Sequence, residues 1–103
     1  MGGGNYISGE VINGVFKSEL FSFPTGTTAG LYLALFRPST LKPVLGVDYI
    51  AKRVNYFGES WQITAEGSGQ QFILSTTTDY HLQPGDALGI EFDVAKAVMI
   101  VRG

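Results

Sequence analysis

The residues that could carry out chemistry are few and lie far apart in the sequence. His81 is the only histidine, and the chain has no cysteine, so a thiolate nucleophile and a thiolate metal site are both excluded. No serine lies in a G-x-S-x-G elbow, and neither a G-x-x-x-x-G-K-[ST] nor a G-x-G-x-x-G phosphate loop occurs. We therefore interpret His81 as a solvated loop residue and expect no catalytic residue, metal site or cofactor in this chain.

A pair of carboxylates, Glu91 and Asp93, has a spacing that could serve acid–base chemistry. The two residues alternate with apolar ones, so on a strand they would share one face. Charge on such a face also keeps it in water. We favour the interpretation that these carboxylates keep the face solvated over a catalytic role, and predict a solvent-exposed strand face here.

Hydroxyl side chains and a lysine could together bind a small oxyanion. Hydroxyls and backbone amides both donate hydrogen bonds to such a ligand. The candidate ligand or interface residues are Arg37, Ser39, Lys42, Ser75, Thr76, Thr77 and Thr78. Threonine runs are also common in strands because β-branched residues favour them, which is the competing structural explanation.

Four aromatic residues could form a platform on which the bases of single-stranded nucleic acid stack. These are Tyr49, Tyr56, Phe57 and Trp61. Nucleic-acid binding requires a basic face, whereas the net charge is −2 and the cationic residues are scattered. We therefore expect these aromatics to pack in a core and expect no nucleic-acid partner.

Length and composition favour one domain. The chain has 103 residues, of which 45% are hydrophobic and 16% charged, enough apolar material for a single core. No apolar run reaches the ~20 residues that a membrane-spanning helix needs, and the start lacks the pattern of a signal peptide. We predict an intracellular protein in which residues 1–5 are a linker remnant or tag and residues 6–103 form the domain.

Turn residues divide the chain into about eight predicted strands. Asn13-Gly14 and Gly67-Ser68-Gly69 predict hairpins, Val15–Phe23 is expected to be a strand with a bulge or bend, and Ser39 could cap one helical turn. Strands at this spacing, with no helical pattern, indicate an all-β sandwich or barrel. A closed barrel would also remove exposed strand edges.

The end of the chain suggests where such a barrel would close. Gln83–Asp86 predicts a tight turn, followed by an alternating strand from Leu88 to Val94. The uninterrupted apolar run Ala97–Val101, like Leu31–Phe36, is typical of a strand covered on both faces. We expect the wet strand and the covered strand to lie side by side as the seam of the barrel.

Four short motifs in this order resemble the C-terminal regulatory domain of ABC-transporter ATP-binding subunits, the transport-associated OB-fold (TOBE-type) domain. The entry fits an N-x-x-x-G-x-V pattern, and the last motif fits the closing L-x-x-G-D segment of these domains. The segments that carry the resemblance are Gly4–Val11, Leu35–Leu41, Val54–Glu59 and Leu82–Ala97. The family commonly has Glu where this chain has Ser39, so the contact of that carboxylate is not carried over.

The resemblance implies OB-like β-barrel lobes that carry out no reaction themselves. It implies a cytoplasmic domain, peripheral to the inner membrane through the transporter, whose partners are the nucleotide-binding domain of the same subunit and a second copy of the subunit. A regulatory protein or a small anion is a further partner in such families. The alternative function is an oxyanion-binding module similar to molybdate-binding proteins, although the S-A-R-N segment of those proteins is missing at Gly4–Tyr6.

Overall fold

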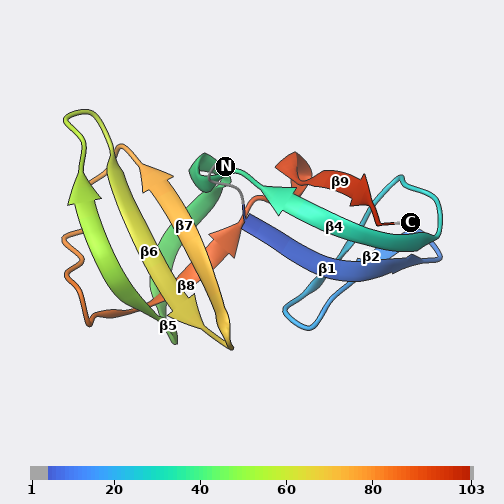
Figure 1. Ribbon diagram of the computed structural model, residues 1–103, viewed down its shortest axis with the longest axis horizontal. Coiled ribbons are helices and arrows are strands. Elements are labelled where there is room, and N and C mark those ends of the chain that lie inside the picture. Colours follow the sequence, from blue (N-terminus) through green and yellow to red (C-terminus); the bar gives the residue numbers. More distant parts are fainter. Residues whose placement is uncertain (1–4, 103) are drawn as a thin grey trace.

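The computed structural model describes residues 5–102, which form nine strands in two antiparallel sheets (Figure 1). Two single 3-10 turns, η1 (Pro38–Thr40) and η2 (Val94–Lys96), are the only helical segments in this part of the chain. The predicted all-β class is therefore confirmed. Residues 1–4, most of the predicted linker or tag, lie outside the described range, whereas Asn5 already belongs to the first strand.

Sheet A, on the right in Figure 1, is made of five strands in the order β3-β2-β1-β4-β9. Their bounds are β1 (Asn5–Ile12), β2 (Val15–Lys17), β3 (Ser22–Pro24), β4 (Gly30–Phe36) and β9 (Val98–Val101). Sheet B has the order β7-β6-β5-β8. Its strands are β5 (Leu41–Tyr56), β6 (Trp61–Gly67), β7 (Gln70–Thr76) and β8 (Ala87–Phe92). All of sheet B is thus inserted in the sequence between β4 and β9.

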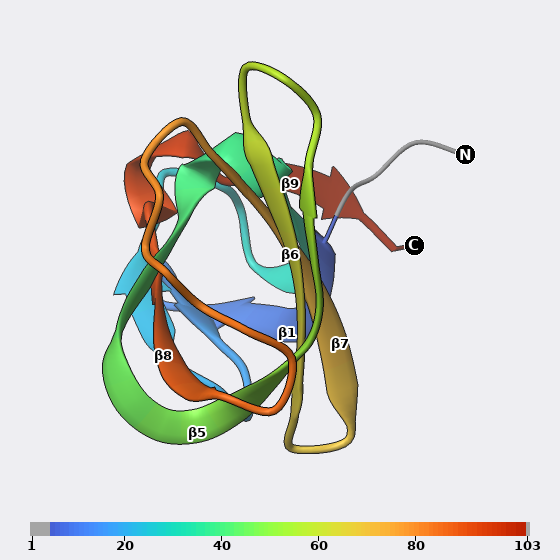
Figure 2. The ribbon, with the colours of Figure 1, turned by 90° about the vertical axis from the view of Figure 1, so that its left-hand side faces the viewer.

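The prediction of a closed barrel is wrong, because neither sheet closes on itself. Within the described residues β3 and β9 are the two edges of sheet A, and β7 and β8 are the edges of sheet B. The architecture is an open β-sandwich. Sheet B is nevertheless strongly curved, since β5 is irregular in its pairing between Val44 and Tyr49 and again between Ala51 and Arg53. Figure 2 shows the curved path of β5.

The turn signals of the sequence are confirmed. Asn13 and Gly14 both have positive φ and join β1 to β2, and Ser68 and Gly69 join β6 to β7 in the same way. Val15–Phe23 breaks into two short strands, as the predicted bend requires, so the structure has nine strands where about eight were expected. The break is held by Ser18, whose hydroxyl accepts hydrogen bonds from two backbone N–H groups at 3.2 Å.

The predicted seam is wrong. β8 ends sheet B, whereas β9 pairs with β4 in sheet A, so η2 carries the chain from one sheet to the other. This crossing runs beside the earlier one at η1, because the Asp93 N–H donates to the Thr40 carbonyl at 3.0 Å. Both crossings lie between the two sheets in Figure 1. An apolar run alone does not specify which edge it joins.

The inner faces of the two sheets share one core, which a group of aromatic rings crosses. Phe36 of sheet A and Phe72 of sheet B are fully buried, and both rings contact that of Phe92, at centroid distances of 5.2 and 5.4 Å. Phe21, from the loop after β2, packs on Phe92 at 4.9 Å. Aromatic burial on this scale is the main apolar contribution that holds the sheets together.

Asn5 joins the two sheets through its side-chain amide. Its Oδ1 accepts from the Ile73 N–H at 2.7 Å, and its Nδ2 donates to the Ile73 carbonyl at 2.9 Å. The same Nδ2 lies 3.2 Å from the Phe36 carbonyl of sheet A. Asn5 is buried, so these bonds satisfy the polar atoms of its amide, and the groups of Ile73 that they join are partly buried. The amide thereby bonds to the free edge of β7 as a neighbouring strand would.

Candidate functional site

A small hollow brings together most of the residues proposed from the sequence as an oxyanion site. The hollow has a volume of about 330 Å³. Its lining is Ser39, Leu41, Lys42, Ser75, Thr76, Thr77 and Tyr80. We call this group the hydroxyl hollow. Five of the seven candidate residues lie in it, although they come from two segments more than thirty positions apart in the sequence.

The hydroxyl hollow forms where η1 meets the end of β7. Pro38 starts the 3-10 turn, and both the N–H and the hydroxyl of Thr40 donate to the Arg37 carbonyl, at 2.9 and 2.7 Å. Ser39 is therefore not the cap of this turn, contrary to the prediction. The turn sets Ser39 and Lys42 against Ser75 and its neighbours, since β5 begins at Leu41 directly after it.

Two candidates, Arg37 and Thr78, do not line the hydroxyl hollow. The N–H of Thr78 donates to the Thr76 hydroxyl at 3.1 Å, so Thr78 belongs to the local turn after β7. Tyr80 lines the hollow but was not among the candidates, because it follows the strand in a loop whose path the sequence does not define. Tyr80 adds a phenolic hydroxyl, a further hydrogen-bonding group, to the residues that line the hollow.

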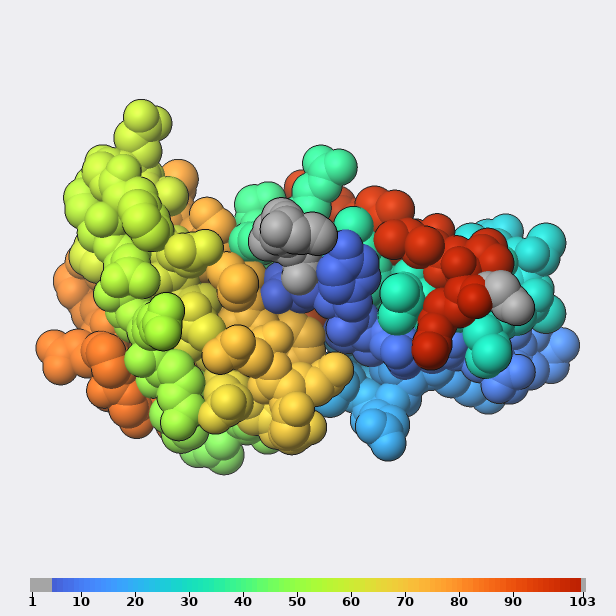
Figure 3. All heavy atoms as spheres, in the orientation of Figure 1, coloured from blue at the N-terminus to red at the C-terminus, as the bar shows by residue number. Residues whose placement is uncertain are grey.

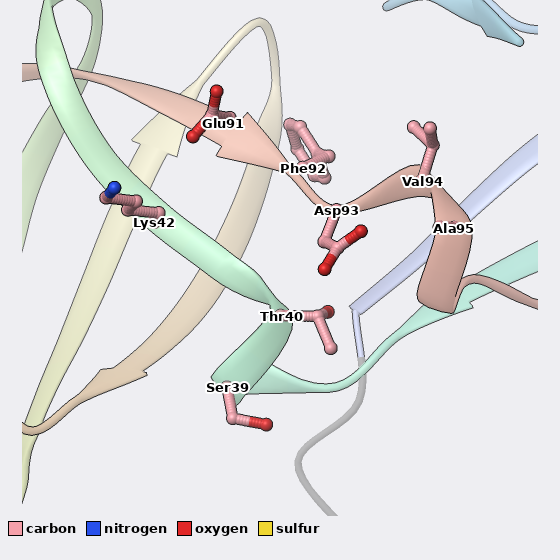
Figure 4. A pocket seen from close by; sticks show the side chains of 8 residues that line it. All are labelled: Ser39, Thr40, Lys42, Glu91, Phe92, Asp93, Val94 and Ala95. Atoms are coloured by element: carbon pink, nitrogen blue, oxygen red, sulfur yellow. The ribbon is translucent and has the colours of Figure 1, made fainter.

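A second hollow, of about 470 Å³, adjoins the first and shares Ser39 and Lys42 with it (Figure 4). Glu91 and Asp93 also line it, and Lys42 lies opposite Glu91 in the pairing of β5 with β8. Figure 4 shows the Asp93 side chain directed toward Thr40. Two carboxylates beside one lysine make this hollow unfavourable for an anion, whereas no carboxylate lines the hydroxyl hollow.

His81 lies in an exposed loop, with 86% of its side chain accessible. Its Nδ1 is 3.5 Å from a carboxylate oxygen of Asp79, and its own N–H donates to the other oxygen at 2.8 Å. Neither His81 nor Asp79 lines any of the hollows described for this part of the chain. Within residues 5–102, no group of three His, Cys, Asp or Glu side chains could hold a metal ion.

The four aromatics considered as a stacking platform do not share one environment. Tyr49 is buried, with its ring 5.8 Å from that of Phe72, as core packing predicts. Tyr56 and Phe57 are exposed at the end of the β5–β6 hairpin, and Trp61 packs on Tyr56 at 4.6 Å. Core packing therefore accounts for Tyr49 but not for the exposed pair.

The apolar runs predicted to be covered on both faces are covered on only one. On β4 the residues Tyr32, Ala34 and Phe36 are buried in the core, whereas Leu31 is 54% exposed. On β9 the outward-facing Val98 and Ile100 are exposed, at 44% and 38%. This leaves an apolar outer face on sheet A, and in Figure 3 the red atoms of β9 lie uncovered beside those of β1 and β4.

No protein-family model matches the chain, and no curated protein matches it. Among residues 5–102 the structure has no helix with the length and apolar character needed to cross a membrane.

Proposed function

We propose that the chain is a non-catalytic regulatory and dimerisation domain of the transport-associated OB type, belonging to the ATP-binding subunit of an ABC-type solute importer. In this proposal it lies in the cytoplasm and reaches the inner membrane only through the transporter. Its partners are the nucleotide-binding domain of its own subunit and a second copy of that subunit. It binds no nucleic acid.

The observation that carries the dimerisation part is the apolar outer face of sheet A, since a domain that holds two subunits together needs such a surface. The transporter context rests on the order of the four sequence motifs. Two of these, Leu35–Leu41 and the end of Leu82–Ala97, contain the crossings between the sheets and bond to each other through Thr40 and Asp93. The motifs thus belong to the segments that set one sheet against the other.

The coding DNA upstream of Met1 tests the transporter context. A Walker-type G-x-x-x-x-G-K-[ST] motif in the same reading frame is expected. In the subunit that contains it, deleting residues 5–102 should weaken the association of the two subunits while each ATPase domain still binds nucleotide. A stop codon directly upstream, with no ATPase in frame, would contradict the proposal.

The convergence of five candidate residues on the hydroxyl hollow favours a second function, the binding of a small oxyanion. Lys42 would supply the charge, and the hydroxyls of Ser39, Ser75 and Thr77 would donate hydrogen bonds. Calorimetry with molybdate, tungstate, sulfate and phosphate tests it. One of these should bind the native chain and the Lys52→Ala control but not Lys42→Ala, and the absence of heat with all four would exclude this function.

A further inference from the structure

We infer that the outer face of sheet A binds the same face of a second copy of this chain, so that two copies pack sheet against sheet about a two-fold axis. The inference rests on the proposed dimerisation function and names the surface and the partner. Antiparallel sheets commonly pack face to face in this way, about 10 Å apart.

The strand register shows which side chains share the outer face. In one row Tyr6 of β1 pairs with Leu35 of β4, which pairs with Val98 of β9. In the next row Ser8, which also faces outward, pairs with Leu33, which pairs with Ile100. Alternation along the strands adds Leu31 and Ile12 to the same side. The apolar outer-face residues are therefore Tyr6, Ile12, Leu31, Leu33, Leu35, Val98 and Ile100.

This face carries large apolar side chains on neighbouring strands, with Ser8 and Glu10 between two of them on β1. Five of its seven members are large hydrophobic side chains that are exposed: Tyr6, Ile12, Leu31, Val98 and Ile100. They lie on three adjacent strands, and leucines that are only partly buried fill the rows between them. Patches of this kind on soluble domains usually mark interaction surfaces. Uninterrupted apolar strands are typical of sheets with both faces covered, and this chain covers only one.

The charges on the face favour a second copy as the partner. Glu10 and Lys17 are its charged residues on β1 and β2; they lie opposite each other in the pairing of the two strands, and both are exposed. Glu19 and Arg102 line the same hollow on this face. The face thus carries two acids beside two bases and has no net charge from these residues. In a two-fold interface the same patch meets itself, so it must be self-complementary. A strongly acidic or basic partner would find no complementary charge here.

The test is a measurement of mass by light scattering and sedimentation equilibrium on the whole chain, from about 1 µM to about 1 mM, which covers weak and moderate affinities. The native chain should shift from monomer to dimer within this range. Ile100→Glu places two charges in a two-fold interface, one from each copy, and should weaken association by about 30-fold or more.

Leu45→Glu is the matched control. Leu45 is a fully exposed leucine on the irregular part of β5 in sheet B. Its substitution by Glu therefore makes the same change in charge as Ile100→Glu, but on a different apolar patch. The control should dimerise like the native chain, and circular dichroism should show both variants folded. A native chain that stays monomeric at every concentration, or a dimer that Leu45→Glu breaks and Ile100→Glu does not, would overturn the inference.

Failure of this inference can be told apart from failure of the proposed function. If the chain dimerises through sheet A but no ATPase domain lies in its reading frame, only the transporter function is lost. If deletion of residues 5–102 separates the parent subunits while the isolated chain stays monomeric and Ile100→Glu leaves the parent intact, only the surface named here is wrong.

Discussion

Strands β4 and β6 are both seven residues long and lie inside their sheets, and they differ most in the side chains that they present outward. Inward, β4 buries Tyr32, Ala34 and Phe36, and β6 buries Ile63 and Ala65. Outward, β4 presents three leucines, and β6 presents Gln62, Thr64 and Glu66. The Glu66 carboxylate there lies 3.5 Å from the Lys52 ammonium. The polar outer face of sheet B is stable in contact with water, whereas the apolar outer face of sheet A is stabilised only when another surface covers it.

The inner faces of the two sheets should contribute equally to the stability of the fold. Substitutions in the shared core test this and should have the largest effects on the free energy of unfolding. Phe36→Ala in sheet A and Phe72→Ala in sheet B each remove a fully buried ring. Each should lower the free energy of unfolding by about 3–5 kcal/mol in urea titrations. Phe57→Ala, which removes an exposed ring, should change it by less than about 0.5 kcal/mol. A two-step transition in either core variant would show that the sheets unfold separately.

The polar connection between the sheets should have the next largest effect. Asn5→Ala leaves the N–H and the carbonyl of Ile73 without their side-chain partners. The expected loss of stability is about 1–2 kcal/mol, since a fully buried polar group without a partner costs about 1–3 kcal/mol and the groups of Ile73 are partly buried. Asn55→Ala, at an exposed position on β5, is the control. Equal stability of the two variants would show that water replaces the Asn5 amide without loss.

Exchanging the outer residues of the two sheets sharpens the comparison further. Leu33→Thr on β4 should weaken dimer formation about tenfold while changing the stability of the monomer by less than about 1 kcal/mol. Thr64→Leu on β6 should leave the dimer unchanged, because the outer face of sheet B takes no part in it. The same mass measurements decide, and a dimer strengthened by Thr64→Leu alone would place the interface on sheet B.

The smallest effect concerns Tyr49, in the core of sheet B. Burial raises the pKa of its phenol above the ordinary value of 10.0, and the charge of Asp48 adds to this. Below pH 10 the folded and unfolded chains both keep the proton, so the contribution to stability is constant. Above pH 10 the unfolded chain ionises first, and the free energy of unfolding should fall as the pH rises toward the native pKa. Tyr49→Phe should remove this part of the slope.

Local features of the fold could be predicted from the sequence, and long-range pairing could not. Asn13-Gly14 and Pro84-Gly85 define turns through their own backbone preferences, so their places were found correctly. The apolar run Val98–Val101 fits the edge of either sheet equally well, and its partner β4 is set by the whole topology. Asn5 was assigned to a linker because a polar residue near a terminus carries no sign of burial.

The candidate site was predictable in its residue types but not in its outline. Ser39 and Lys42 meet Ser75 and Thr76 because η1 turns the chain against β7, a contact that no local pattern encodes. The alternation of β4 held a signal that was missed: leucine at positions 31, 33 and 35, with aromatic and small residues between, describes two different faces and not one enclosed strand.

The hydrogen bond between Thr40 and Asp93 has a consequence for how the molecule assembles. It brings together the points at which the chain enters and leaves sheet B, so residues 41–92 form an insert whose two ends are hydrogen-bonded to each other. Once that insert has folded, only the short segments on either side of the Thr40–Asp93 hydrogen bond separate β4 from β9. The loop that must close to pair these strands is then short, and the entropy lost in pairing them is small. We therefore expect the four-stranded insert to form early, with the final strand docking last.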